Sequence, residues 1–240
     1  MNKQPRVEIY VQARMGSTRL PGKVLKEVQG RPLLEYLFER LSGVKEADGL
    51  VVLTSVLEQD DIIEAVCEKQ GIRTFRGSEK DVLGRYYHAA EKYKPDAIVR
   101  ITADCPLIDP RVVDTGIRLY RQGFPEKDYI SNTLERTFPR GMDVEIFSAE
   151  VLSRMYFSAQ SPDEREHVTL YIGKHLSLFR SQQFKATSNY SHYRVTVDTS
   201  LDFDLAQKII EHFYPHNPLF SLEELISLLK AHPEWPSLDN

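Results

Sequence analysis

One short segment of this chain gathers positive charge and small residues directly after an apolar run at residues 7–11. Three cationic side chains are spaced along it, namely Arg14, Arg19 and Lys23. Between them lie residues whose backbone amides an anion can approach: Gly16, Ser17 and Thr18. Cationic groups beside accessible N–H donors suit the phosphates of a nucleotide. The segment matches neither GxxxxGK[ST] nor GxGxxG. It therefore predicts a triphosphate-binding loop of another kind, and a basic surface loop is the alternative.

Two aspartates follow apolar runs, where they could hold a divalent cation. Asp104 comes after the run 97–102, and Asp198 ends the run 193–197 before a helical pattern. Open α/β sheets bind ligands beyond the carboxyl ends of their strands, so we expect both aspartates and the basic loop at one crevice. Carboxylates beside phosphates suit Mg²⁺, and their oxygens suit Mn²⁺ as well. The alternative for Asp198 is a helix N-cap.

Four further residues are candidates for contact with a substrate. Asp143 and Glu145 alternate in a strand-like segment and would share one face, where they could bind substrate or complete a metal shell. Glu166 and His167 precede a helical pattern, and a structural hydrogen bond is the alternative role for His167. The sequence shows no Ser-His-Asp arrangement and no nucleophilic cysteine context.

The elements that must position these residues follow from the periodicity of apolar side chains. The first 110 residues alternate strand-like and helix-like patterns, which indicates an α/β chain with a parallel sheet. We expect one domain over residues 1–240, with an excursion at roughly 125–190. Strands are predicted at 7–11, 49–54, 72–75, 97–102, 129–132, 144–147 and 193–197. Helices are predicted at 33–41, 60–70, 82–93, 111–121, 149–158, 201–214 and 222–229. A further helix that ends at 174 is expected after a charged turn at 161–167.

Composition limits the partners and the compartment. The chain has 240 residues and a net charge of −4, which gives no overall electrostatic reason to bind nucleic acid or a membrane. Its first ten residues are too polar for a signal peptide, and no run of about 18 apolar residues occurs, so a cytoplasmic location is expected. Cys67 and Cys105 are far apart and lack metal-ligand spacing, which predicts free thiols.

The stretch QARMGSTRLPGKVL at 12–25 closely resembles the signature of the sugar cytidylyltransferases. That family includes the CMP-deoxyoctulosonate synthetases and the acylneuraminate cytidylyltransferases. The resemblance is strongest to its branch of spore-coat polysaccharide biosynthesis cytidylyltransferase-like proteins. Further similar segments follow in order along the chain: RGSEKDVLGRYYHAA at 76–90, RITADCPLIDP at 100–110, GMDVEIF at 141–147, REHVTLYI at 165–172 and RVTVDTSLDFDLAQKI at 194–209.

The resemblance implies a nucleotide-diphospho-sugar transferase fold, which is Rossmann-like and of the GT-A type, with a mixed, mostly parallel sheet between helices. It implies Mg²⁺-dependent nucleotidyl transfer and an excursion that forms a homodimer contact. The residues it assigns to catalysis are Arg14 and Lys23 on the triphosphate, Asp104 on Mg²⁺ and Asp198 as the second metal-site acid. The nucleotide-binding set it implies is Ala13, Arg14, Gly16, Ser17, Thr18, Arg19, Lys23, Gly77, Ser78, Arg85 and Asp104.

The expected reaction is transfer of CMP from CTP to a sugar acid or sugar phosphate, with release of pyrophosphate, for surface-polysaccharide or glycan biosynthesis. In the deoxyoctulosonate branch a Gln-Gly pair precedes the metal-site acid, whereas Thr102 and Ala103 precede Asp104 here. This difference argues against that branch's sugar acid.

Three alternatives stay open. The same transfer could use GTP or UTP. A glycosyltransferase of related fold would favour an Asp-x-Asp metal motif, which only Asp202-Phe203-Asp204 matches, although charges at a helix start explain these aspartates as well. A non-catalytic nucleotide-binding module is the third.

Overall fold

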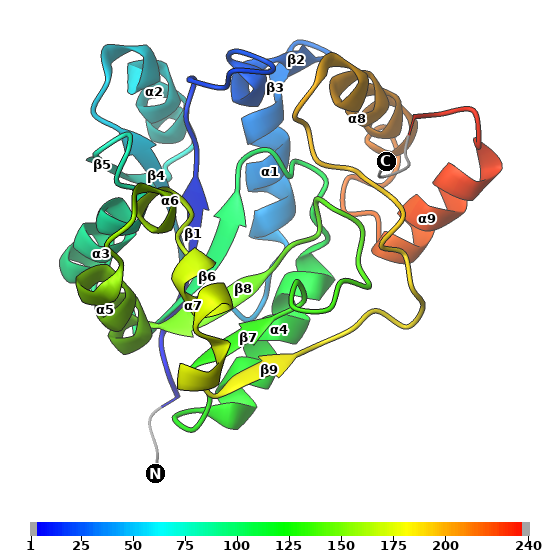
Figure 1. Cartoon of the computed structure of the whole chain (residues 1–240). Coiled ribbons are helices and arrows are strands. Elements are labelled where there is room, and N and C mark those ends of the chain that lie inside the picture. Colours follow the sequence, from blue (N-terminus) through cyan, green and yellow to red (C-terminus); the bar gives the residue numbers. More distant parts are fainter. Residues whose placement is uncertain (1–3, 237–240) are drawn as a thin grey trace.

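The computed structural model describes residues 4–236, which are built around one seven-stranded sheet (Figure 1). The strand order is β5-β4-β1-β6-β8-β7-β9. The strands are β1 (Val7–Gln12), β4 (Gly49–Ser55), β5 (Arg73–Gly77), β6 (Ala97–Thr102), β7 (Tyr129–Ser131), β8 (Glu145–Ser148) and β9 (Ser181–Gln183). Strand β8 runs antiparallel to β6 and β7, and the other pairs are parallel. The expected α/β fold with a mixed, mostly parallel sheet is confirmed.

Helices cover both faces of this sheet and enclose two hydrophobic cores (Figure 1). The first core takes side chains from α1 (Leu33–Ser42), α2 (Asp61–Lys69), α4 (Pro110–Gly123), α8 (Ser200–Phe213) and α9 (Leu222–Ala231). The second takes them from α3 (Val82–Tyr93), α5 (Ala149–Ser158) and α7 (Leu170–Lys174). The short elements are α6 (Pro162–Glu166), the hairpin β2 (Glu27–Val28) and β3 (Arg31–Pro32), and the 3₁₀ turns η1 (Lys23–Leu25), η2 (Glu58–Asp60) and η3 (Leu176–Leu178).

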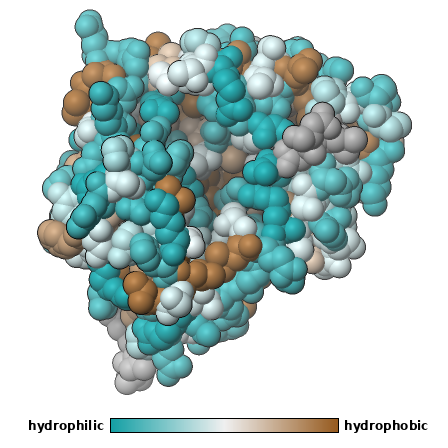
Figure 2. Space-filling view, viewed as in Figure 1, coloured by the Kyte–Doolittle hydropathy of each residue, from teal (hydrophilic) through white to brown (hydrophobic). Residues whose placement is uncertain are grey.

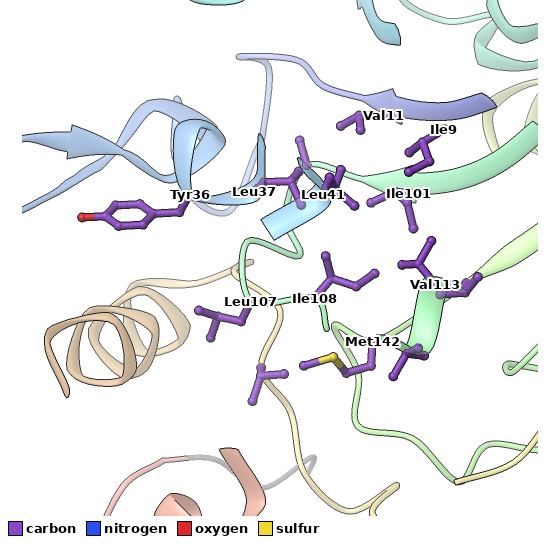
Figure 3. Close-up of a cluster of buried hydrophobic side chains, with 14 of the residues drawn as sticks. Ile9, Val11, Tyr36, Leu37, Leu41, Ile101, Leu107, Ile108, Val113 and Met142 are labelled. Carbon is purple, nitrogen blue, oxygen red and sulfur yellow. The ribbon is translucent and has the colours of Figure 1, made fainter. Parts of the chain in front are cut away.

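Alternation along β1 explains why the sheet is covered on both faces. Ile9 and Val11 lie in the first core, whereas Tyr10 lies in the second. A strand buried on both faces needs apolar side chains at nearly every position. Figure 3 shows Ile9 and Val11 in one cluster of buried side chains with Leu37 and Leu41 of α1. The central strands are thereby fixed, and their carboxyl ends carry the basic loop and Asp104.

Two expectations about secondary structure were wrong. Residues 161–167 contain the helix α6 rather than only a turn, because Ser161 and Glu164 form a capping box around Pro162 in its first turn. Residues 193–197 are not a strand of the sheet. Their backbone instead pairs with loops and forms an isolated bridge between Arg140 and Arg194. Strand β9 and the β2–β3 hairpin were not predicted from the sequence.

Two further observations concern expectations from composition. Within residues 4–236, no helix combines the length and the apolar character needed to cross a membrane. Cys67 and Cys105 are both free, as predicted, and both are buried. Burial raises the pKa of the Cys105 thiol well above its usual value, and the neighbouring charge of Asp104 adds to this effect.

Arg40 is a fully buried cation that joins three distant parts of the chain. Its Nε donates to the carbonyl oxygen of Ile108 at 2.7 Å, and its Nη1 and Nη2 donate to those of Pro218 at 2.7 Å and Phe220 at 2.8 Å. The guanidinium also lies over the ring of Phe220, 3.8 Å from its centroid. Burial lowers the pKa of Arg40 to about 10. This side chain therefore holds α1, the turn after Asp104 and the segment before α9 together.

Replacing Arg40 with Met should lower the free energy of unfolding by about 3 kcal/mol or more, since three carbonyl oxygens lose their donor. Equilibrium denaturation in urea measures this change. Arg118→Met, on the solvent side of α4, is the matched control and should change the free energy by less than about 0.5 kcal/mol. An Arg40→Met protein as stable as the parent chain would contradict the linking role.

Candidate active site

The basic loop leaves the carboxyl end of β1 and is anchored in the middle. The backbone N–H of Met15 donates to Asp60 Oδ1 at 2.7 Å, and Asp60 is fully buried just before α2. The N–H of Gly22 donates to the carbonyl oxygen of Met15 at 3.0 Å, which closes the loop. Gly22 has a φ of +66°, a left-handed conformation that glycine adopts without strain. The chain then turns into η1 and presents Lys23 to the end of the sheet.

Asp104 follows β6, and its backbone holds the segment that carries Asp198. Its carbonyl oxygen accepts from the N–H of Val197 at 2.7 Å and from Thr196 Oγ1 at 3.0 Å. Gly141 packs against the same segment from another side, because it has a φ of +103° and lacks a Cβ, which would come within 2.8 Å of the Thr196 nitrogen. The segment 193–197 thus brings Asp198 beside Asp104 without joining the sheet.

Lys23 lies between these two aspartates. Its Nζ is 2.9 Å from Asp104 Oδ2 and 2.8 Å from Asp198 Oδ1, and its side chain is only 12% exposed. Burial lowers the pKa of Lys23, but the two carboxylates raise it by more, so the pKa stands above its usual value. A permanent positive charge therefore occupies the space between the two carboxylates.

Asp198 has two further cationic partners. Its Oδ2 lies 3.0 Å from Arg19 Nη2 and 2.7 Å from Arg194 Nη2. Burial raises the pKa of Asp198, but Lys23 and Arg194 lower it by more, so the pKa falls below its usual value. The Asp198 carboxylate is therefore ionised at neutral pH, and it faces three cationic side chains.

The residues after Asp198 start a helix. Thr199, not Asp198, is the N-cap of α8, and it forms a capping box with Asp202. Asp202 also accepts a hydrogen bond from Arg194 Nε at 3.0 Å and is buried. The expected helix-start role of Asp202 is confirmed. Its carboxylate is already bound to the start of α8 and to Arg194. The first acid of the Asp-x-Asp pattern at 202–204 is therefore not available to bind a metal.

Two cavities lie at this end of the sheet, and Figure 2 shows the recess near the centre of the molecule's face, with hydrophilic side chains along its rim. The larger cavity has a volume of about 290 Å³. It is lined by Gln12, Ala13, Arg14, Ser17, Thr18, Arg19, Lys23, Val24, Thr102, Ala103, Asp104, His167 and Asp198. The smaller one, of about 110 Å³, is lined by Gln12, Ala13, Arg14, Val82, Arg85, Glu166 and His167.

Most of the residues singled out in the sequence lie on these two cavities. Arg14 reaches across the recess, and its Nη2 is 3.5 Å from Glu166 Oε1 of α6. Residues from the basic loop, from both strand-ending aspartates and from α6 thus surround one space. Five expected residues line neither cavity: Gly16, Gly77, Ser78, Asp143 and Glu145.

Asp143 and Glu145 line neither cavity, and both are engaged in ion pairs. Both carboxylate oxygens of Asp143 accept from Arg136. Glu145 is buried, pairs with Arg100 and accepts a hydrogen bond from a tyrosine hydroxyl of β7. The expectation that both lie on one strand was wrong, because β8 begins only at Glu145. A role of these two acids in binding substrate stays a prediction.

Sequence reasoning missed several lining residues. Gln12, Val24, Val82, Thr102 and Ala103 line the cavities, but none was named as a candidate site residue, because all five are uncharged. Only Gln12 had a visible signal, since a polar amide ends the apolar strand β1. Thr102 has a positioning role as well, because its Oγ1 donates to Asp104 Oδ1 at 2.5 Å.

The donor set at this site fits a hard divalent cation held together with phosphates. Residues 4–236 contain no cluster of three or more His, Cys, Asp or Glu side chains that could bind a metal unaided. Mg²⁺ does not require one, because it commonly takes one or two carboxylates and completes its shell with phosphate oxygens and water. Asp104 and Asp198 supply two carboxylates that already converge on one cation, the Lys23 ammonium.

Comparison with known proteins agrees with this geometry. A family model described as cytidylyltransferase matches residues 9–230. The spore coat polysaccharide biosynthesis protein SpsF of Bacillus subtilis is 40% identical over 233 residues, which cover 93% of this chain and 94% of that protein. A 3-deoxy-manno-octulosonate cytidylyltransferase of Anaeromyxobacter dehalogenans is 28% identical over 69% of this chain and 72% of that protein.

A solved structure gives the same result. A cytidylyltransferase from Leptospira borgpetersenii superposes with a TM-score of 0.93 at 36% identity, and the match covers 98% of each chain. Its strong similarity extends over the loop, the sheet and the helices described above. The resemblance noted in the sequence is confirmed, and this chain belongs to the cytidylyltransferase family.

Proposed function

We propose that this chain transfers CMP from CTP to a sugar acid or sugar phosphate and releases pyrophosphate, in a pathway of surface-polysaccharide or glycan biosynthesis. The observation that carries the proposal is the convergence of Lys23, Asp104 and Asp198 beside the basic loop. The names of the relatives support the chemistry, since one is a polysaccharide biosynthesis protein and another a cytidylyltransferase for a sugar acid.

In this reaction an oxygen of the acceptor forms a bond to the α-phosphorus of CTP, and the bond from that phosphorus to pyrophosphate breaks. Such transfers depend on in-line positioning and on stabilisation of negative charge. Arg14, Arg19 and Lys23 would hold the phosphates along the loop. No general base from the protein is needed when the acceptor is an ionised oxygen.

We propose that Asp104 and Asp198 hold Mg²⁺ during turnover. A divalent ion at this position would neutralise phosphate charge and lower the pKa of an attacking hydroxyl. For two carboxylates to receive it, the Lys23 ammonium must leave the space between them. The phosphates of a bound nucleotide would offer Lys23 a new partner, so metal and nucleotide should bind together.

The glycosyltransferase alternative finds little support in these contacts. Its metal motif would need Asp202, whose carboxylate is buried and already shared between the α8 cap and Arg194. A non-catalytic module would have no need of two aspartates at the mouth of a phosphate loop. A cytoplasmic location and the absence of nucleic-acid and membrane partners stay predictions from charge and hydropathy.

The first test of the function is a thermal-shift series with CTP, GTP, UTP, ATP and TTP, each with and without Mg²⁺. CTP with Mg²⁺ should raise the melting temperature most, because a ligand that binds only the folded chain stabilises it. A panel of sugar acids and sugar phosphates should then release pyrophosphate from CTP. If CTP neither stabilises the chain nor supports pyrophosphate release with any acceptor, the proposal fails.

Replacing Lys23 with Met should strengthen metal binding in the absence of nucleotide, since a competing positive charge is removed. We expect Mn²⁺ affinity, measured by electron paramagnetic resonance, to rise by about tenfold. Asp104→Asn should abolish this binding and most of the turnover, whereas Asp204→Asn, an exposed acid on α8, should change neither. Equal Mn²⁺ affinity in the Lys23→Met and parent chains would contradict the exchange between Lys23 and the metal.

We also propose that the chain forms a homodimer through the region at roughly 125–190. Large apolar side chains are exposed there, with Phe157 at 72% and Leu178 at 57%. Exposed apolar groups of this kind often mark protein interfaces. Light scattering should give the mass of two chains, and a double substitution of Phe157 and Leu178 by Lys should give the mass of one. A parent chain that is monomeric at tens of micromolar would contradict the dimer.

A further inference from the structure

Each of the two aspartates at the end of the sheet has one carboxylate oxygen on Lys23 and the other oxygen on a different group. Lys23 Nζ contacts Asp104 Oδ2 at 2.9 Å and Asp198 Oδ1 at 2.8 Å. These two oxygens therefore face the same point, and all three residues line the larger cavity. The groups that bind the opposite oxygens, Asp104 Oδ1 and Asp198 Oδ2, decide how each carboxylate is turned.

Thr102 holds the outer oxygen of Asp104. Its hydroxyl donates to Asp104 Oδ1 at 2.5 Å. The Cys105 thiol lies 3.5 Å from the same oxygen as a weak donor. The backbone of Asp104 is fixed as well, because its carbonyl oxygen accepts from Val197 and Thr196. Asp104 therefore cannot turn Oδ1 toward the space that Lys23 occupies without losing the Thr102 hydroxyl.

Arg194 holds the outer oxygen of Asp198, and Asp202 holds Arg194. Arg194 Nη2 lies 2.7 Å from Asp198 Oδ2. Asp202 accepts from Arg194 Nε at 3.0 Å and from Nη2 at 3.3 Å. Asp202 is fixed in turn, because its Oδ2 accepts from the backbone N–H groups of Asp198 and Thr199, each at 2.8 Å. A planar guanidinium with two contacts to such a carboxylate keeps a constant direction.

Arg19 contacts the same oxygen of Asp198 but is not fixed in this way. Its Nη2 lies 3.0 Å from Asp198 Oδ2, and its side chain is 61% exposed. Arg19 and Lys23 both line the larger cavity, where the phosphates of a nucleotide can draw them away. Arg194 lines neither of the two cavities and is only 20% exposed. It therefore stays on Asp198 when Arg19 and Lys23 turn to the phosphates.

We propose that Thr102 and Arg194 are positioning residues that restrict Asp104 and Asp198 to one free oxygen each, and that this restriction makes the site select Mg²⁺ over Ca²⁺. The inference rests on the proposed function, since it requires both aspartates to hold a divalent cation. It assigns roles to two residues that do not themselves contact the ion.

The two ions differ in how they use carboxylates. Mg²⁺ needs few protein oxygens, because phosphate oxygens and water complete its octahedral shell. Ca²⁺ takes more oxygens in a looser arrangement and often binds both oxygens of one carboxylate. Two carboxylates that each offer a single oxygen therefore suit Mg²⁺ and leave Ca²⁺ short of ligands.

Thr102→Val removes the hydroxyl and nearly keeps the shape of the side chain. The chain is mixed with CTP and Mn²⁺ without an acceptor, and bound Mn²⁺ is followed by electron paramagnetic resonance while Mg²⁺ or Ca²⁺ is added. The ratio of Mg²⁺ to Ca²⁺ affinity should fall by about tenfold, because the freed carboxylate can offer Ca²⁺ its second oxygen. Free CTP binds these ions equally in every sample, so differences between variants report on the protein.

Two variants serve as controls for Thr102→Val. Thr102→Ser keeps the hydroxyl and should keep the parent ratio of Mg²⁺ to Ca²⁺ affinity. Thr115→Val, on α4, is the matched substitution away from the site and should leave the ratio unchanged.

Arg194→Met tests the other aspartate and should lower the same ratio by about tenfold. Arg194→Lys keeps the charge but loses the two contacts with Asp202, so its ratio should lie between those of Arg194→Met and the parent chain. In steady-state kinetics the KM for Mg²⁺ should rise in Arg194→Met, whereas the KM for CTP at saturating Mg²⁺ should change by less than about twofold. Arg118→Met is the matched control, and Thr102→Val carries the test if Arg194→Met does not fold.

The outcomes distinguish this inference from the proposed function. Suppose the parent chain binds Mn²⁺ with CTP and Asp104→Asn does not. If the Thr102 and Arg194 variants then keep the parent ratio of Mg²⁺ to Ca²⁺ affinity, the positioning role alone is overturned. An equal loss of affinity for both ions overturns it too, because the two residues then only support the fold. A parent chain that binds no Mn²⁺ beyond that held by free CTP overturns this inference together with the proposed metal site.

Discussion

Two carboxylates held together in a half-buried recess repel each other unless a cation lies between them, and this condition organises the site. Asp104 and Asp198 satisfy it through Lys23, whose ammonium contacts both. The interaction between two charges is several times stronger in a partly buried place than in water. The position of each of the three groups therefore depends on the other two. The carboxyl end of β6, the loop after β1 and the segment 193–197 are therefore parts of one arrangement, although they lie far apart in the sequence.

Supports for this arrangement come from outside the cavity. Asp60 holds the basic loop through a backbone amide, and Gly141 gives room for the segment that carries Asp198. Asp202 ties Arg194 to the first turn of α8, so that Arg194 can face Asp198 from a fixed direction. Each of these residues acts by placing another one. Their contribution gives the charged side chains that line the site a defined geometry.

The strand ends could be predicted from the sequence, because the change from an apolar strand to an amphipathic helix marks the point where a strand stops. The loop or acid at that point must then lie at the edge of the sheet. Asp104 and the basic loop were found in this way. Asp143 and Glu145 were expected on one strand, but β8 begins only at Glu145, and their partners Arg136 and Arg100 are set by the tertiary fold and not by local spacing. The run 193–197 has the composition of a strand, but its backbone partners lie in loops. The polar strand β9 and the unpaired amide of Gln12 carry no periodic signal.

The hydrogen bonds of Arg40 have a consequence for the cooperativity of the molecule. They connect the turn after Asp104 to the carbonyls of Pro218 and Phe220, and Asp109 accepts from the N–H of Leu222 at the start of α9. Local opening reactions in proteins follow such shared contacts, and segments that share them unfold as one unit. Opening of the carboxyl-terminal helix would uncover a buried cation and release the turn beside Asp104. Fraying of α9 would therefore also loosen the turn that follows Asp104, the aspartate that we propose as a metal ligand.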